Sequence, residues 1–248
     1  MALEPINNYD PIEFNLARKY AEAWQETCVL KAFLFHRNDI ECILSEKRAE
    51  AVRFYMGIKV EGEKKCPDMM VVGVDDKNKD IISLVDANSG IYDFTMPCPR
   101  TCDSSSYLYF NTGPGTIGSE SCASRDPGRT PSTKTECNIA GFEISITEAK
   151  ASTGVWQTLF DLKSVVFKKE DLTEIFTQLG VDDIRVYFGL NDEGVERIIL
   201  VGVDANGEDE FKENEFGKKE DLYMNTNSLC TKSSVTTCSV LSPLYHTV

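Results

Sequence analysis

The stretch Ile184–Asp209, IRVYFGLNDEGVERIILVGVDANGED, decides the predicted fold. Its first residues alternate, with Arg185, Tyr187 and Gly189 on one face and apolar side chains on the other, as in a β-strand. NDEG predicts a turn into RIILVGVD, a near-continuous apolar run that suits a central strand. ANG then predicts a tight hairpin turn, so the stretch indicates antiparallel structure.

Much of this pattern occurs twice, at an offset of 132 residues. VRFYMG (Val52–Gly57) aligns with IRVYFG, and VVGVD (Val71–Asp75) aligns with LVGVD after a three-residue length change. A repeat on this scale predicts a tandem duplication. Upstream matches extend it: Trp24-Gln25 aligns with Trp156-Gln157, and Leu30-Lys31 with Leu162-Lys163.

The repeat predicts two domains, in residues 1–103 and 141–248, joined by a linker in residues 104–140 that is rich in Ser, Thr, Gly and Pro. Each unit is predicted to form an α+β domain, an antiparallel sheet with helices packed on one face, and the two units to be related by a pseudo-two-fold axis. Short apolar runs predict strands at residues 32–35 and 164–167. Apolar periodicity predicts helices at Pro11–Thr27, Arg37–Lys47, Ile146–Leu159 and Lys169–Leu179, the third interrupted by Gly154.

The chain is acidic, with 26 Lys and Arg residues against 40 Asp and Glu residues and a net charge of −14. This charge disfavours general binding to nucleic acids or to anionic membranes. The first unit carries a net charge of −5, the linker 0 and the second unit −9, so a basic partner is expected to meet the second unit. MALEPINNYDPIEF has no signal-peptide pattern, and no apolar run reaches about 18 residues, so we expect a soluble, cytoplasmic protein.

An odd number of cysteines without a secretion signal argues against a disulfide framework, so we expect mainly reduced thiols, buried in the case of Cys28 and Cys42. Cys98 and Cys102 form the closest pair, a C-x3-C spacing. A zinc site usually needs a second pair or histidines. The alternatives for this pair are therefore free thiols, a metal site or a disulfide, and we expect no cofactor.

The Arg-x-Tyr pair recurs as Arg53 with Tyr55 and as Arg185 with Tyr187. Arg and Tyr are favoured at interface hot spots, so the pairs are candidates for a partner, anion or ligand site. The alternative that we favour is structural. In it the Arg stacks on the Tyr and pairs with an acidic residue of the neighbouring strand, Asp75 or Asp204.

Other motifs point away from catalysis. DDKNKD (75–80) and DANGED (204–209) could bind Ca²⁺, but their spacing is that of a hairpin turn and not of an EF-hand. GPGTIG (113–118) matches a dinucleotide fingerprint, yet no helix is predicted to follow it. His36 aligns with Lys168, and His246 lies in the C-terminal tail, so no nucleophile–base pair stands out. We expect a protein that is not an enzyme.

Aromatic residues concentrate where the first unit passes into the linker, in IYDFTMPCPRTCDSSSYLYF (91–110). They are too many for a flexible loop, so we expect them to pack against a domain or a partner. The residues are Tyr92, Phe94, Tyr107, Tyr109 and Phe110.

Several motifs resemble a set of small bacterial proteins of Bacteroidetes type, each about one unit long and without an assigned activity. The motifs are FKKEDL (Phe167–Leu172), IRVYFGLNDEG (Ile184–Gly194), LVGVDANGED (Leu200–Asp209) and IYDFTMPCPRTCD (Ile91–Asp103). The second unit has NSLCTKSSVTTC where the pattern leads one to expect Pro-Cys-Pro. The resemblance implies no reaction and no cofactor.

Duplication without a catalytic cluster favours a non-enzymatic protein that binds another protein or itself, because two copies of a domain extend the binding surface. An acidic inhibitor of a basic protein and a self-assembling scaffold are the two versions of this hypothesis. The alternative is a small-ligand or metal-binding module, with hydrolytic activity as one version. It would use the Arg-Tyr pairs or the turn between Cys98 and Cys102.

Overall fold

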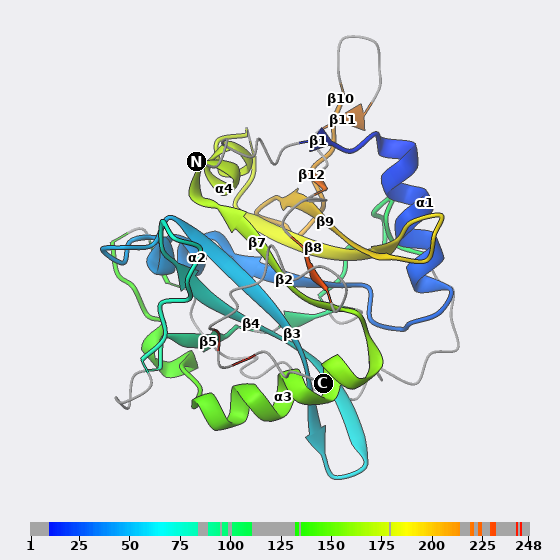
Figure 1. The fold of residues 1–248 in the computed structure, drawn as a ribbon. Helices are drawn as coiled ribbons and strands as arrows, with labels where there is room; N and C mark the ends of the chain where they lie inside the picture. The colour runs from blue at the N-terminus through cyan, green and yellow to red at the C-terminus, as the bar shows by residue number, and fades with distance from the viewer. Residues whose placement is uncertain are drawn as a thin grey trace, which may run out of the picture.

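The computed structural model describes residues 10–83, 89–94, 96–98, 101–110, 132–133, 135–178, 180–213, 219–220, 223–224, 229–231, 242 and 244. Across these residues the chain has a mixed α+β fold with two large antiparallel sheets (Figure 1). Within the described part, no helix has both the length and the apolar character that crossing a bilayer requires. The helices are α1 (Phe14–Gln25), α2 (Arg37–Leu44), η1 (Ala140–Phe142, a 3-10 turn), α3 (Ile146–Leu159) and α4 (Lys169–Phe176).

The two sheets are named after their central strands. The β8 sheet has the order β1-β12-β9-β8-β2-β6, and its strands are β1 (Asp10–Pro11), β12 (Tyr223–Met224), β9 (Glu196–Val203), β8 (Asp183–Leu190), β2 (Ala32–His36) and β6 (Met96–Pro97). The β3 sheet has the order β13-β7-β3-β4-β5, and its strands are β13 (Leu229–Thr231), β7 (Leu162–Lys168), β3 (Ala51–Glu61), β4 (Lys64–Val74) and β5 (Ile91–Asp93). A separate small hairpin joins β10 (Lys212–Glu213) to β11 (Lys219–Glu220).

The four α-helices lie in the four segments that apolar periodicity predicts. Helix α3 forms in spite of Gly154 because its first turn is closed by a capping box. The Ser145 hydroxyl accepts the N–H of Glu148 at 3.1 Å, and the Glu148 carboxylate accepts the N–H of Ser145 at 2.9 Å. Helix α4 ends at Phe176, and Gly180, a few residues beyond, takes a positive φ of 90°.

Each sheet contains strands from both halves of the chain, so the expectation that each unit builds its own sheet is wrong. Strand β2 of the first half pairs with β8 of the second, with Phe33 opposite Val186. Strand β7 of the second half pairs with β3 of the first, with Val165 opposite Phe54. The reason lies in α2 and α4, which begin at the residue after β2 and β7 end and carry the chain to the opposite sheet.

The core lies mainly between the two sheets, whose inner faces meet through apolar side chains. The rings of Phe35 in the β8 sheet and Phe54 in the β3 sheet are 4.9 Å apart, centroid to centroid. On the outer faces, α1 covers β8 through Ala17 and Ala21, and α3 covers β3 through Ala149. The molecule is therefore layered helix–sheet–sheet–helix, with α1 and α3 on opposite sides (Figure 1).

Glycine in the Arg-x-Tyr-x-Gly segments allows the outer helices to approach the sheets. A Cβ atom on Gly189 would lie 2.9 Å from the Cβ of Tyr20 in α1 and 3.3 Å from its backbone carbon. A Cβ atom on Gly57 would overlap the Ser152 hydroxyl of α3. Each position therefore requires a residue without a side chain at the helix–sheet contact.

Candidate functional site

The four residues of the Arg-Tyr pairs are all buried, with at most 1% of any side chain exposed. The Arg185 guanidinium forms an ion pair with Asp209 and donates to the carbonyl oxygens of Gly207 at 2.9 Å and Thr101 at 3.0 Å. The Tyr187 hydroxyl donates to the same Asp209 carboxylate. Burial raises the pKa of Tyr187 to about 12, so the phenol stays protonated and donates.

The other Arg-Tyr pair repeats this arrangement in the β3 sheet. Arg53 forms an ion pair with Asp80, and the Tyr55 hydroxyl donates to the same carboxylate. Both pairs are therefore part of the interior and do not reach a surface that a partner or ligand could contact.

The expectation that Asp75 and Asp204 pair with the arginines was wrong. Asp75 accepts the backbone N–H groups of Lys77 and Lys79, each at 2.9 Å. Asp204 accepts the equivalent backbone N–H groups of its own turn. Each aspartate is therefore used to close a turn, and the predicted hairpin turns are present. Strands β4 and β9 bridge to the residues just beyond the turns, and these bridges bring Asp80 and Asp209 to the arginines.

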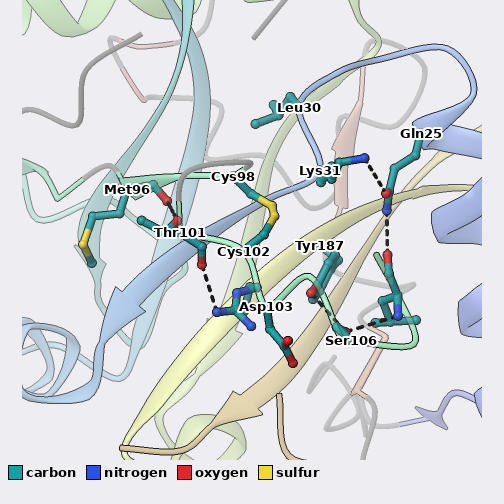
Figure 2. The surroundings of a disulfide bond; sticks show 12 residues. Gln25, Leu30, Lys31, Met96, Cys98, Thr101, Cys102, Asp103, Ser106 and Tyr187 are labelled. Carbon is teal, nitrogen blue, oxygen red and sulfur yellow. Dashed lines mark hydrogen bonds between the residues drawn. A yellow bond between two sulfur atoms is a disulfide. The ribbon is translucent and has the colours of Figure 1, made fainter. Parts of the chain in front are cut away.

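Residues Ser106–Phe110, named here the strap, run over the outer face of the β8 sheet (Figure 2). Gln25 at the end of α1 binds the strap backbone twice: its amide donates to the Leu108 carbonyl at 2.7 Å and its oxygen accepts the Phe110 N–H at 2.9 Å. The Lys31 ammonium donates to Gln25 at 3.2 Å and also to the Phe110 carbonyl. The Ser106 hydroxyl donates to Asp209, the carboxylate that also accepts from Tyr187, and lies 3.2 Å from the Tyr187 hydroxyl.

Similar contacts occur over the β3 sheet. The Gln157 amide donates to the Leu244 carbonyl at 3.0 Å, and the hydroxyls of Tyr55 and Ser242 are hydrogen-bonded to each other at 2.8 Å. The indole N–H groups of Trp24 and Trp156 donate to the carbonyl oxygens of the residues six positions on, Leu30 and Leu162, both at 2.6 Å. These contacts explain why the sequence carries Trp-Gln followed by Leu-Lys in both halves.

The expectation of reduced thiols is wrong for several cysteines. Cys42 is bonded to Cys137, with Cα atoms 5.7 Å apart, and Cys98 to Cys102, with Cα atoms 5.0 Å apart; both separations are ordinary for disulfides. Cys66 is disulfide-bonded as well. Cys28 is a buried thiol, as expected, and burial raises its pKa to about 11. Cys98 and Cys102 hold no metal as a disulfide, and the described residues contain no cluster of three or more metal-ligating side chains.

The turn closed by the Cys98–Cys102 disulfide, drawn in Figure 2, has hydrogen bonds on both sides of it. The N–H of Cys98 donates to the Ala32 carbonyl of β2 at 2.9 Å. On the other side, the Asp103 carboxylate accepts the N–H of Asp209 at 3.1 Å. The turn therefore connects the edge of the sheet to the start of the strap.

Tyr92 and Phe94 lie inside the protein, with 8% and 4% of their areas exposed. Their rings stack at 5.7 Å, and the Tyr92 hydroxyl donates to the Glu46 carboxylate at 3.3 Å. Burial raises the pKa values of both Glu46 and Tyr92. These two aromatic residues pack against the domain, which was one of the two expectations for them.

One histidine is held by a carboxylate at the junction of the two halves, a pairing that sequence reasoning missed. Nδ1 of His36 lies 2.8 Å from Asp183. The same carboxylate accepts the N–H of Arg37 at 3.0 Å, at the start of α2. His36 and Asp183 are opposite each other on β2 and β8, so the pairing of strands from different halves creates this contact.

A cluster of aromatic rings reaches solvent at the strap. Tyr107 is 46% exposed, and its ring lies 5.5 Å from Phe14 at the start of α1 and 5.7 Å from Phe211. Phe14 and Phe211 are themselves 5.8 Å apart. Arg18 donates to the Tyr107 carbonyl at 3.2 Å and lies 5.7 Å from the centre of the Phe110 ring. These five residues, Phe14, Arg18, Tyr107, Phe110 and Phe211, are named here the aromatic surface.

The sequence pointed to part of this surface. The aromatic run singled out Tyr107 and Phe110, but Phe14 and Phe211 come from distant segments and carry no local signal. Two other large apolar side chains of the described residues are well exposed, and they belong to separate elements: Val60 in β3 and Leu159 in α3. The GPGTIG motif, His246 and the remaining cysteines of the tail and linker lie outside the residues whose side chains the structure describes.

Comparisons with protein-family models, with curated proteins and with solved structures found no match to this chain.

Proposed function

We propose that this chain is a non-enzymatic binding protein that contacts a basic protein partner through the aromatic surface. The observation that carries the proposal is Tyr107, an aromatic side chain left 46% exposed where its ring packs against Phe14 and Phe211, which come from two other segments. Aromatic residues and Arg are enriched at interface hot spots relative to the rest of the protein surface.

The net charge of −14 supports a basic partner over a second copy of the chain. Two copies with this charge repel each other, whereas a positively charged partner is attracted and guided into the complex. The second half of the chain carries most of the net negative charge and contributes Phe211. A complex of this kind weakens as salt screens the attraction.

A photo-cross-linking amino acid at position 107, in protein expressed in its native cell, tests the proposal. Leu159 is the matched control position, because it is also 46% exposed but lies on α3, away from the aromatic surface. We expect a defined adduct from position 107, none from position 159, and a lower yield at high salt. Equal labelling from both positions, or none from position 107, contradicts the proposal.

Self-association is tested separately by size-exclusion chromatography with light scattering across protein concentration. We expect a monomer at all concentrations. A dimer that disappears in Tyr107→Glu would assign the aromatic surface to a second copy of the chain instead.

We also infer that the chain arose by tandem duplication. Support comes from matched contacts at matched sequence positions: Trp24 and Trp156 make the same bond over the same distance, as do Gln25 and Gln157 with small differences. Matched local contacts of this kind are expected when two copies of one ancestral unit keep the same packing. A search of related genomes for proteins of half this length that keep the same contacts tests the duplication. Finding none would count against it.

We propose that the protein works in an oxidising compartment and not in the cytoplasm. Disulfides persist in oxidising surroundings and are rare in cytosolic proteins, and Cys42, Cys66, Cys98, Cys102 and Cys137 are all disulfide-bonded. Alkylation of the protein in its native cell, followed by a non-reducing digest, tests this. We expect the linked peptides of Cys42 and Cys137, and alkylation of both thiols would contradict the proposal.

A further inference from the structure

The Cys98–Cys102 disulfide lies immediately before the strap, which supplies Tyr107 and Phe110 to the aromatic surface. We propose that this disulfide is a redox clasp, whose reduction releases the strap and takes the aromatic surface apart. The inference rests on the proposed function for what the surface binds, and on the contacts around the turn for how the release occurs.

The cross-link joins two differently anchored points of the chain. Cys98 is fixed to the sheet, because its N–H donates to the Ala32 carbonyl and its side chain is only 1% exposed. Cys102 precedes Asp103 and leads into the strap. While the bond is intact, the start of the strap is therefore held against the edge of the β8 sheet.

Once that bond is broken, only noncovalent contacts hold the strap. Leu108 is the one apolar side chain of the strap that is fully buried, and Tyr107 faces solvent. Tyr109 and Phe110 pack partly buried against the same apolar cluster. The polar contacts of the strap come from Gln25, Lys31, Arg18 and Asp209. A segment with one fully buried apolar side chain opens at lower free energy than the core, so we expect a covalent constraint to affect its opening.

The reaction is a thiol–disulfide exchange with a dithiol reductant. Cys102 is the more accessible sulfur, since it is partly exposed whereas Cys98 is buried. The thiolate of the reductant attacks Sγ of Cys102, the S–S bond breaks, and Cys98 leaves as a thiolate that takes up a proton. The second thiol of the reductant then breaks the mixed disulfide, which leaves Cys102 as a thiol and the reductant as a disulfide.

Hydrogen–deuterium exchange of the full-length protein tests the clasp without any partner. In the double variant Cys98→Ser/Cys102→Ser, we expect the amides of Leu108 and Phe110 to exchange at least about tenfold faster, which corresponds to about 1.4 kcal/mol. Dithiothreitol should accelerate strap exchange in the unmodified chain in the same way. Reduction of this disulfide adds two hydrogen atoms, which a mass measurement detects. The matched control is Cys42→Ser/Cys137→Ser, which should leave strap exchange within about twofold.

Unchanged strap exchange in Cys98→Ser/Cys102→Ser overturns the inference, and so does equal acceleration in both double variants, because that indicates general destabilisation. Cross-linking from position 107 separates the two proposals. Adducts that form in the oxidised protein and disappear in Cys98→Ser/Cys102→Ser support the clasp, and adducts that persist there overturn it. If the oxidised protein gives no adduct, the proposed function fails while the exchange data still decide whether the strap is released.

Discussion

Asp209 illustrates how single buried charges hold this molecule together. Its side chain is fully buried, pairs with Arg185 and accepts from Tyr187 and Ser106. An ion pair taken out of water is costly to form, and its worth depends on complete hydrogen bonding. Breaking the pair from one side leaves a charge without its partner, which is far more damaging than losing a charge at the surface.

We therefore expect Asp209→Asn to lower the free energy of unfolding by about 3–5 kcal/mol, measured by urea denaturation. The control is Asp192→Asn, which removes a surface pair with Lys19 in which both side chains are more than half exposed. That change should stay within about 0.5 kcal/mol. Equal effects of the two substitutions would show that the buried pair contributes no more than the exposed one.

Asp171 gives a pH dependence whose sign follows from burial. Burial raises the pKa of Asp171 to about 6, from an ordinary value of 3.8. A carboxyl with a raised folded-state pKa binds its proton more tightly in the folded state, so its contribution to stability is complete below about pH 4 and is lost as the pH rises through about 6. The group therefore opposes folding at neutral pH.

Urea unfolding of the unmodified chain and Asp171→Asn at several pH values between 4 and 7 measures this contribution. The free energy of unfolding of the unmodified chain should fall relative to that of Asp171→Asn as the pH rises. Asparagine keeps an oxygen that can accept the Lys168 N–H, so the capping contact itself is preserved. Parallel pH profiles would mean that Asp171 does not titrate in this range.

At the scale of elements, the contact between α1 and β8 depends on a missing side chain. Gly189→Ala would place a methyl group against the backbone of Tyr20, which cannot move without shifting α1. We expect a loss of about 1–3 kcal/mol in the free energy of unfolding, the usual cost of overpacking. Gly141→Ala is the control, because nothing lies within 4 Å of its Cβ position, and it should be close to neutral.

Sequence patterns predicted the elements well and their partners poorly. Periodicity located the four α-helices because an amphipathic pattern is a local property of the chain. The pairing of β2 with β8 depends on contacts between residues far apart in sequence, such as Phe33 and Val186, and alternation gives no information about them. For the same reason the aromatic run predicted Tyr107, whereas Phe211 could be assigned to the same surface only from the fold.

The disulfide pairing could not be predicted from the sequence either. Nine cysteines allow many connectivities, and spacing singled out Cys98 with Cys102 but gave no reason to pair Cys42 with Cys137. The aspartates that pair with the arginines were predicted wrongly for a geometric reason. Asp75 and Asp204 are closest along the strands, yet their carboxylates accept hydrogen bonds from the turns.

For the whole molecule, the interleaved sheets predict that the two halves of the chain unfold together. The chain contains two tryptophans, Trp24 in the first half and Trp156 in the second, and both lie in the central core. The variants Trp156→Phe and Trp24→Phe each keep one tryptophan. Within each variant, we expect the unfolding midpoint measured by tryptophan fluorescence to equal the midpoint measured by circular dichroism, as in two-state unfolding. Fluorescence and circular dichroism midpoints that differ within one variant would indicate separately folding halves.

The Cys42–Cys137 and Cys98–Cys102 disulfides should differ in their effect on global stability. The Cys42–Cys137 bond spans 95 residues, whereas the Cys98–Cys102 bond spans 4. Loop-closure entropy predicts a loss of about 4–5 kcal/mol for Cys42→Ser/Cys137→Ser and about 2 kcal/mol for Cys98→Ser/Cys102→Ser. Urea denaturation of the two double variants checks the order, and a larger loss from the short bond would contradict it.

The interleaving of strands also has a consequence for biogenesis. Strand β2 leaves the ribosome long before β8 exists, and until then the first half carries sheet edges that lack their native neighbours. A nascent chain can meet the corresponding strand of another molecule during this interval, which produces an exchanged dimer. Refolding at high protein concentration should therefore yield interlocked oligomers, whereas dilute refolding should return the monomer slowly, at a rate limited by contacts such as Phe33 with Val186.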